Sequence, residues 1–533
     1  MFSFLRFRWK LWIVILGIPY YLIFLTIEPP KAFQISPETT YFTSPLTPSG
    51  RVDYGQALNL RYGPVSPADN VVIPLLRLYS PASLPIGTEA AAIASLLGTP
   101  FPLPADLSYR PLDEFLASSA VSTPEVVSGT RDAASAAFLA ASLTPRPIDA
   151  EFPQPPVDIG KVRLKECGCK PWKASEYPDV DSWINANQQS FALLADASQR
   201  KRFWWPFLQG DSGDDLLAGK LFGRSHYVQA HRGLLARSMR RLGTGDTDGS
   251  LSDLQIALRL SRHVTETDFL VDKLLGLLTL DETLKTCEAW ITIASLSPKL
   301  CDQLADSLSV LRPIPSMNNA LETEHLWQFV LLYNQAYDKN HAVQQYVDFN
   351  QLARRFLQLK ASHSKILSDP DLKRKLETLT VWSTQPNSFD WLDDKNQLIW
   401  RIVKVILFTT RWTKVSAITD LYGDVVLSIA VPNYSELIRH SLTVAVRLDL
   451  VHLAALLKKA QITTGTFPPR LEMILPDAAS IPIDPFSGKP LIYRYENNGC
   501  LMYSYGHNFA DDGAASDTSA TTRSDDIVVR LAP

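Results

Sequence analysis

One pair of residues in the sequence has the spacing of a known metal-binding helix. Glu322 and His325 are three positions apart, so they would share one face of a helix. A carboxylate-bridged di-iron centre uses this Glu-x-x-His spacing twice, together with two further glutamates. The sequence contains no second Glu-x-x-His, and we therefore discount a di-iron centre.

An acidic segment at 246–249 (DTDG) has the composition of a calcium loop but not its spacing. An EF-hand loop needs glycine at its sixth position and glutamate at its twelfth, whereas glycine is fourth here. We predict a turn between two helices instead. The nine histidines are dispersed, and neither a G-x-S-x-G motif nor a glycine-rich phosphate loop is present. The sequence therefore predicts no catalytic residues and no organic cofactor.

The composition is that of a globular protein that does not bind nucleic acid. A chain of 533 residues exceeds one hydrophobic core, which favours two or three domains. Apolar residues make up 46% of the chain, and the net charge of −3 gives no basic footprint. Among five cysteines, Cys167 and Cys169 are too close for relaxed disulfide geometry, and we predict most of the five to be buried small apolar residues.

The N-terminus has the pattern of a single membrane anchor. Residues 11–27 (LWIVILGIPYYLIFLTI) carry no charge and follow a basic tail, 1–10, that contains Arg6, Arg8 and Lys10. As a helix these 17 residues reach roughly 26 Å, close to the thickness of a bilayer core. The positive-inside rule places the N-terminus in the cytoplasm. We predict a single-pass inner-membrane protein that contacts lipid through one helix, with its bulk periplasmic or extracytoplasmic.

A cleaved signal peptide is the alternative interpretation of the same segment. Its basic start and apolar stretch fit, but no A-x-A-like cleavage site follows Ile27. Both interpretations place the rest of the chain outside the cytoplasm.

The remainder divides into three parts, and the fold class is mainly α. Residues 28–178 form a connector rich in Pro, Ser and Ala, with short helices at 54–61, 68–79, 90–97 and 133–143. Residues 179–432 show the helical period and predict an irregular, solenoid-like α-helical domain. Its expected helices span 182–197, 227–242, 250–263, 269–295, 300–311, 325–337, 342–359 and 397–410. Within it the aromatic run 203–207 (FWWPF) follows three basic residues; we predict burial between helices, with a binding surface as the alternative.

Residues 433–533 predict an α+β module with a small antiparallel sheet. A long helix at 434–461 precedes two alternating aromatic and aliphatic runs, 491–495 and 500–505, separated by an Asn-Gly signal at 498–499. This signal is typical of a β-hairpin. A third strand is expected at 526–531.

The order of motifs in this module resembles the C-terminal half of the major pseudopilin of type II secretion systems. The motifs are "GTFPPRLEMI" after the helix, "IPIDPFSGKPLIYRY", "LMYSYG", an acidic loop and "SDDIVV", within residues 443–530. The helical middle and tail also resemble uncharacterised membrane-anchored proteins of the planctomycete group. The pseudopilin leader and its glutamate within the apolar helix are missing, and some 400 residues separate anchor and module. We therefore do not predict a pilus subunit.

The pseudopilin resemblance implies a calcium site in the acidic loop. Carboxylate and amide oxygens suit a hard cation, which takes six to eight oxygen ligands. Phe509 stands where the family usually has glycine, and a solvated acidic loop is the alternative. The residues that match the family's calcium ligands are Asn508, Asp511, Asp512, Asp525 and Asp526.

These observations favour a non-enzymatic scaffold or protein-interaction protein that is anchored in the membrane, exposed in the envelope and bound to a protein partner there. Two alternatives stay open. The resemblance implies an accessory component of a type II secretion or pilus-like system. A hydrolase whose site is assembled from residues distant in the sequence is also compatible with the chain. A polar pocket with converging titratable groups would favour an enzyme, and an apolar groove along the helices would favour a binding protein.

Overall fold

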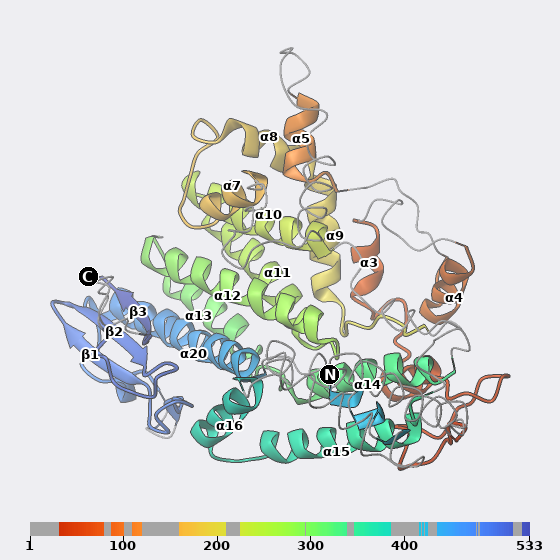
Figure 1. Cartoon of the computed structure of the whole chain (residues 1–533). Helices are drawn as coiled ribbons and strands as arrows, with labels where there is room; N and C mark the ends of the chain where they lie inside the picture. Colours follow the sequence, from red (N-terminus) through yellow and green to blue (C-terminus); the bar gives the residue numbers. More distant parts are fainter. Residues whose placement is uncertain are drawn as a thin grey trace, which may run out of the picture.

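The fold is mainly helical, with one small antiparallel sheet near the C-terminus, as the sequence predicts (Figure 1). The computed structural model describes residues 31–78, 87–100, 109–119, 159–208, 224–293, 295–337, 346–384, 415–416, 418–420, 422–424, 434–475, 477, 480–514 and 525–532. The basic tail 1–10, the anchor 11–27 and the helices expected at 133–143 and 397–410 lie outside the described residues.

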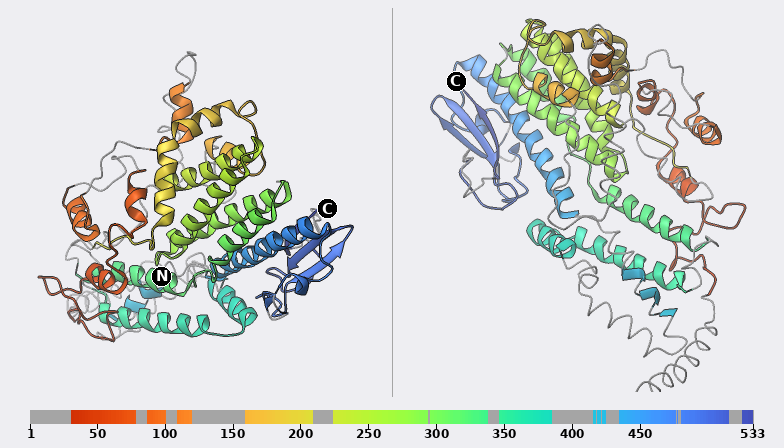
Figure 2. Two further views of the ribbon diagram at one scale, coloured as in Figure 1. Left: turned by 180° about the vertical axis from the view of Figure 1, so that it is seen from behind. Right: turned by 45° about the horizontal axis from the view of Figure 1, so that its top comes forward.

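A row of helices forms the centre of the molecule, and each packs mainly on its neighbours in the row (Figures 1 and 2). Apolar residues at three- and four-residue spacing face the adjacent helix, and a continuous cluster of buried side chains runs through the row. In packing order the row comprises α10 (Arg224–Gly243), α11 (Thr247–Thr265), α12 (Leu270–Ile293), α20 (Tyr434–Thr464) and α13 (Pro298–Ser309).

The predicted turn between helices lies at 244–246, slightly earlier than expected, and residues 247–249 of the acidic segment form the first turn of α11. Asp246 is the N-cap residue, and its carboxylate accepts a hydrogen bond from the Gly249 backbone N–H at 2.9 Å. At the other end of α11, Gly276 of α12 lies close to Thr265. A Cβ at position 276 would be 2.5 Å from the Thr265 nitrogen, so glycine permits the close crossing of these helices.

The helix expected at 182–197 is interrupted at Asn187, so α8 (Pro178–Ala186) and α9 (Gln188–Gln199) replace it. The Asn187 side chain explains the break. Its amide donates to the Trp183 carbonyl at 3.0 Å and accepts from the Arg110 N–H at 3.0 Å. These bonds compete with helical bonds and attach α5 (Leu112–Ser119), through the residues that precede it, to α8.

A second cluster of buried residues joins the described part of the connector to the helices between 318 and 367. Tyr54, at the start of α2 (Tyr54–Tyr62), packs against Phe329 and Tyr333 of α14 (Asn318–Gln335). The remaining elements are α3 (Val72–Leu76), α4 (Gly87–Leu97), α7 (Ile159–Cys167), α15 (Phe349–Leu367) and α16 (Leu372–Thr384). The aromatic run 203–207 is buried as predicted, with Trp204 and Trp205 each 4% exposed.

The C-terminal sheet has the order β1-β2-β3 and is antiparallel throughout. Its strands are β1 (Ile492–Glu496), β2 (Gly499–Ser504) and β3 (Ile527–Leu531), and a 3₁₀ turn, η5 (Leu471–Met473), precedes them. Asn497 and Asn498 both have positive φ, 50° and 61°, as a type I′ hairpin turn requires. The predicted hairpin and third strand are therefore confirmed.

Helix α20 is shared between the sheet and the helical row. It packs on β2 and β3 and also on α12 and α13 (Figure 2). Among the described residues it is the single helix long and apolar enough to cross a membrane by length and composition, with half of its most apolar window buried. A core helix meets the same criterion, and the packing of α20 on both sides accounts for its apolar character.

Four of the five cysteines are buried and Cys169 is exposed, and none forms a disulfide. This confirms the expectation for most of them.

Candidate functional site

The antiparallel pairing of β2 and β3 brings together the two ends of the acidic loop. Ser504 at the end of β2 is in register with Ile527 at the start of β3. Three carboxylates, from Asp512, Asp525 and Asp526, each offer an oxygen within 4.8 Å of the others. We refer to these three residues as the acidic cluster.

Hydrogen bonds within the loop hold the acidic cluster in place. The Asn508 backbone N–H donates to Asp525 Oδ2 at 2.8 Å, and its side-chain amide donates to Asp512 Oδ2 at 2.8 Å. The Ala514 N–H donates to Asp526 Oδ2 at 2.7 Å. Asn508 therefore contacts the cluster directly.

Asp511, the fifth residue of the predicted set, makes a different set of contacts. Its Oδ1 accepts hydrogen bonds from the Tyr503 hydroxyl at 3.0 Å and from the Gly513 N–H at 2.9 Å. Asp511 therefore fixes the loop to β2 and is not part of the acidic cluster.

The electrostatics of the acidic cluster suit a bound cation. Asp525 Oδ1 and Asp526 Oδ1 are shielded from solvent, and neither accepts a hydrogen bond from the residues that the structure describes. Burial raises the pKa of Asp526, and the neighbouring charges of Asp512 and Asp511 raise it further. A hard cation would both ligate these oxygens and neutralise the repulsion.

Asp484 stabilises the end of β2, next to the acidic loop, and the sequence did not predict this role. It is 1% exposed and accepts hydrogen bonds from the Ser504 hydroxyl at 2.7 Å and the Phe486 N–H at 3.0 Å. It thereby fixes the segment before β1 to the end of β2. The D-P-F-S-G segment at 484–488 was the available signal, because Asp followed by Pro and Gly is typical of a side-chain-stabilised turn.

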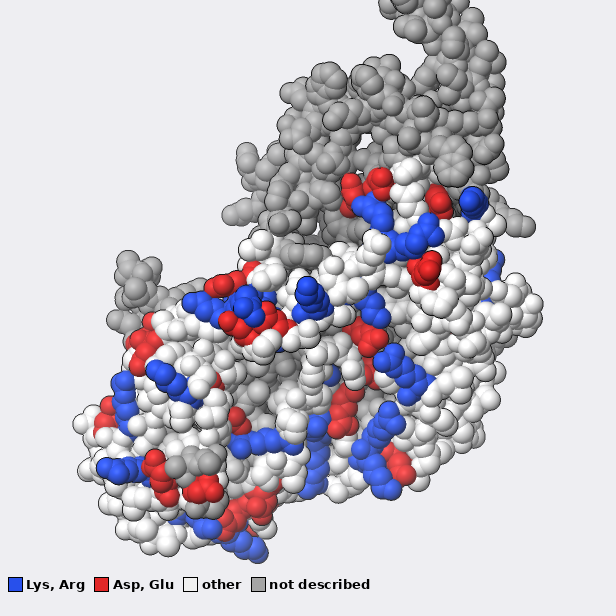
Figure 3. All heavy atoms as spheres, turned by 90° about the horizontal axis from the view of Figure 1, so that it is seen from below, with Lys and Arg blue, Asp and Glu red and all other residues white. Residues whose placement is uncertain are grey.

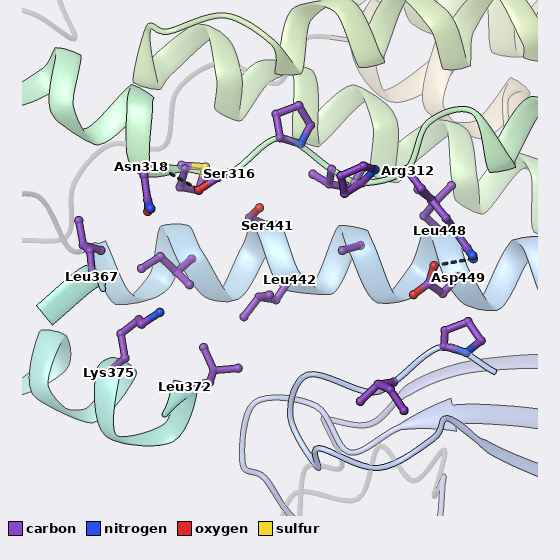
Figure 4. Close-up of a pocket in the computed structure, with 18 residues that line it drawn as sticks. Arg312, Ser316, Asn318, Leu367, Leu372, Lys375, Ser441, Leu442, Leu448 and Asp449 are labelled. Carbon is purple, nitrogen blue, oxygen red and sulfur yellow. Dashed lines mark hydrogen bonds and ion pairs between the residues drawn. The ribbon is translucent and has the colours of Figure 1, made fainter. Parts of the chain in front are cut away.

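A groove of about 540 Å³ runs along α20. In Figure 4, α20 forms its floor, the segment before α14 lies along one side, and α16 with residues 482–483 lies along the other. We call this feature the α20 groove. Its lining is mostly apolar and includes Ile314, Met317, Leu367, Leu372, Ile438, Leu442, Ala445, Leu448 and Ile483.

Two cationic side chains lie in the α20 groove. Arg312 and Asp449 form an ion pair at 2.5 Å at one end (Figure 4). Lys375 extends from α16 toward α20 and forms no ion pair among the described residues. The residues of the groove come from segments up to 171 positions apart, Arg312 to Ile483, so no local pattern in the sequence reveals it.

A nucleophile–base pair exists in the helical row but has no access for a substrate. The Ser261 hydroxyl lies 3.0 Å from His231 Nε2, and Thr283 lies 3.1 Å from the same nitrogen. Ser261, His231 and Thr283 are all 0% exposed, and none lines a described pocket. Burial lowers the pKa of His231 to about 4, as expected for a histidine held neutral in a core.

On the face of the molecule shown in Figure 3, the described residues form no large area of a single charge, because Lys and Arg alternate there with Asp and Glu. This agrees with the absence of a basic footprint in the composition.

Comparison of the chain with protein families, with curated proteins and with solved structures finds no match. The pseudopilin and planctomycete resemblances therefore stay predictions from the sequence.

Proposed function

We propose that this chain is a membrane-anchored scaffold or protein-interaction protein of the cell envelope, and that the α20 groove holds its partner. The observation that carries the proposal is the groove itself. Its volume of about 540 Å³ lies within the range of binding sites, roughly 300–1,000 Å³, and its walls are mainly apolar. An apolar groove along the helices is the feature expected of a binding protein rather than an enzyme.

The lining specifies the chemistry of the partner. Ile438 and Leu442 of α20 and Leu372 of α16 offer surface to an apolar side chain. Lys375 lies beside them with no ion pair among the described residues, so it favours a carboxylate in the same segment. We therefore expect a partner protein that inserts a short segment with two or three apolar side chains and one acidic residue.

The proposal can be tested by site-specific photo-cross-linking in cells. A photoreactive amino acid at Ser441, in the floor of the groove, should yield a discrete adduct with one partner protein. The matched control is the same amino acid at Leu60, an exposed apolar residue (71%) on α2 outside the groove. An identical adduct pattern from both positions, or adducts with lipid alone, would contradict the proposal.

A second candidate function is supported by the acidic cluster. An accessory component of a type II secretion or pilus-like system would share the calcium-stabilised loop that the resemblance implies. Three of the five residues that match the family's ligands lie within 4.8 Å of one another, and Asn508 is bonded to two of these three. If the cross-linked partner is a component of such a system, this candidate replaces the general scaffold.

We propose calcium as the ion of the acidic cluster, since a hard cation prefers carboxylate and amide oxygen. Titration of the full chain with calcium should show one site at millimolar or lower concentration. Absence of uptake by the folded protein would leave a solvated acidic loop.

A further inference from the structure

Three side chains from three different helices converge at one buried point. His325 of α14, His363 of α15 and Tyr434 at the start of α20 are 3%, 0% and 1% exposed. His325 Nε2 lies 2.9 Å from His363 Nδ1 and 3.0 Å from the Tyr434 hydroxyl oxygen. The three rings also contact one another pairwise, with centroids 5.1–5.4 Å apart. We call these residues the His–Tyr cluster.

The orientation of His325 leaves one lone pair for two neighbours. Its other ring nitrogen bonds to the Leu321 backbone carbonyl, which makes Nδ1 the protonated nitrogen and Nε2 the acceptor. A single in-plane lone pair accepts one well-aligned hydrogen bond, yet both His363 Nδ1 and the Tyr434 hydroxyl lie within reach. A backbone carbonyl that fixes the ring in this way is also the usual second partner of a metal-ligating histidine.

The potential ligand atoms lie close to the spacing of a transition-metal coordination shell. With bonds of about 2.0–2.1 Å, two ligand atoms of a tetrahedral site are about 3.3 Å apart. The separations of 2.9 and 3.0 Å are those of hydrogen bonds in the metal-free protein, and an outward shift of about 0.4 Å brings the atoms to the tetrahedral spacing. Both imidazoles are almost fully shielded from water, with 3% of His325 and 0% of His363 exposed.

A polar pocket connects the His–Tyr cluster to the surface. It has a volume of about 290 Å³ and is lined by His325 together with Glu322, Lys360, Asn318 and Ser364. Glu322, one turn before His325, offers a carboxylate on the same side of the pocket, where it now pairs with Lys360 at 3.4 Å. Water and a small ion therefore have a route to His325.

The facing helices also determine how many metal ions the site can take. Glu322-x-x-His325 in α14 lies beside Lys360-x-x-His363 in α15. Lys360 thus occupies the position where a second Glu-x-x-His would place its carboxylate. A cation at this position opposes a second metal ion, so a dinuclear centre is not expected.

We propose that the His–Tyr cluster binds one nitrogen-preferring divalent transition-metal ion, such as Zn²⁺ or Co²⁺. The ligands are His325 Nε2, His363 Nδ1 and the Tyr434 oxygen, and water from the pocket completes the shell. On binding, the His363 proton moves from Nδ1 to Nε2, and the Tyr434 phenol releases its proton to solvent. This site is separate from the acidic cluster and does not depend on the proposed function.

Cobalt titration of the full chain tests the site. The protein is first stripped with a chelator and then kept in excess calcium, which occupies oxygen-only sites without competing for imidazole. We expect one equivalent of Co²⁺ to bind with a visible absorption band, and Zn²⁺ to displace it. His325→Gln and His363→Gln should each weaken binding by at least about 100-fold, since each removes a ligand.

Two further variants keep the test decisive. His452→Gln is the matched control, because His452 is a half-buried histidine of α20 with a pKa lowered to about 4 by burial and lies outside the cluster. Tyr434→Phe keeps the ring and removes only the oxygen, so it should alter the cobalt spectrum while the fold, checked by circular dichroism, stays intact. Unchanged cobalt affinity in both His325→Gln and His363→Gln, or no binding by the stripped wild-type protein, would overturn the proposal.

Discussion

Replacing Asp525 by Asn should make the calcium-free protein more stable and remove its response to calcium. The carboxylate oxygens of the acidic cluster lie within 4.8 Å of one another, so Asp525 takes part in two of three repulsive pairs. At that distance each pair costs about 1 kcal/mol in a water-like dielectric and about 3 kcal/mol at an effective dielectric of 20. Because the residues are only half-buried, we take the lower figure and expect a gain of about 2 kcal/mol.

Calcium should act in the opposite direction on the wild-type protein. An ion present at 100 times its dissociation constant stabilises the folded state by about 2.7 kcal/mol, which slows exchange from the bound loop about 100-fold. Amide hydrogen exchange of β2 and β3, measured by mass spectrometry on the full chain, reports this stability locally. Asp525→Asn should retain the Asn508 hydrogen bond and lose most of the calcium effect.

Asp511→Asn is the matched control for this prediction. Asp511 has the same charge and lies in the same loop, but its Oδ1 is held by Tyr503 and Gly513. It should therefore keep the calcium effect. Equal loss of the calcium effect in both variants, or no effect of calcium on wild-type exchange, would refute the reasoning.

The remaining predictions concern pH, the helical row and the membrane topology. Because the pKa of Asp526 is raised in the folded state, its contribution to stability is fully present below its unfolded pKa and is lost as pH rises through its folded pKa. Amide hydrogen exchange of β3 without calcium should therefore accelerate over that pH window, and calcium should suppress the acceleration. Asp253→Ala should cost about 3–5 kcal/mol by thermal unfolding, because it leaves Arg237, its partner at 2.5 Å, buried without a counter-charge; the exposed Asp248→Ala should cost little. Gly276→Ala should cost about 1–3 kcal/mol, because the new Cβ meets the α11 backbone. A reporter that is active only outside the cytoplasm, fused after residue 533, should be active; an inactive fusion would contradict the topology predicted from the basic tail and the apolar run.

Local patterns in the sequence were sufficient for most elements of the fold. The three-strand sheet could be predicted from the Asn-Gly signal and from alternation, because a strand's period and a hairpin turn are properties of adjacent residues, although the turn residues are Asn497 and Asn498 and Gly499 begins β2. The break at Asn187 was missed, because the bond that stabilises it comes from Arg110, far away in the chain. Periodicity alone continues a helix through such a residue.

The candidate sites were predictable to different degrees. The acidic cluster could be anticipated because its members flank two strands that pair, although the turn of Asp511 toward Tyr503 could not. The Glu-x-x-His spacing identified Glu322 and His325 in the sequence, but His363 follows His325 by 38 residues and has no Glu-x-x-His pattern of its own. The α20 groove had no signal, since it arises from the packing of α16, α20 and two loops.

The central claim is that the α20 groove binds a partner protein, and the affinity of the cross-linked partner for purified full-length variants tests it most directly. Leu442→Lys places a charge on the apolar floor of the groove, whereas Leu60→Lys makes the same change on the exposed face of α2. We expect the wild-type chain and Leu60→Lys to bind the partner equally, and Leu442→Lys to bind at least about 100-fold more weakly, since burying an unpaired ammonium costs several kcal/mol. Wild-type affinity in a folded Leu442→Lys protein would show that the partner binds elsewhere and would contradict the claim.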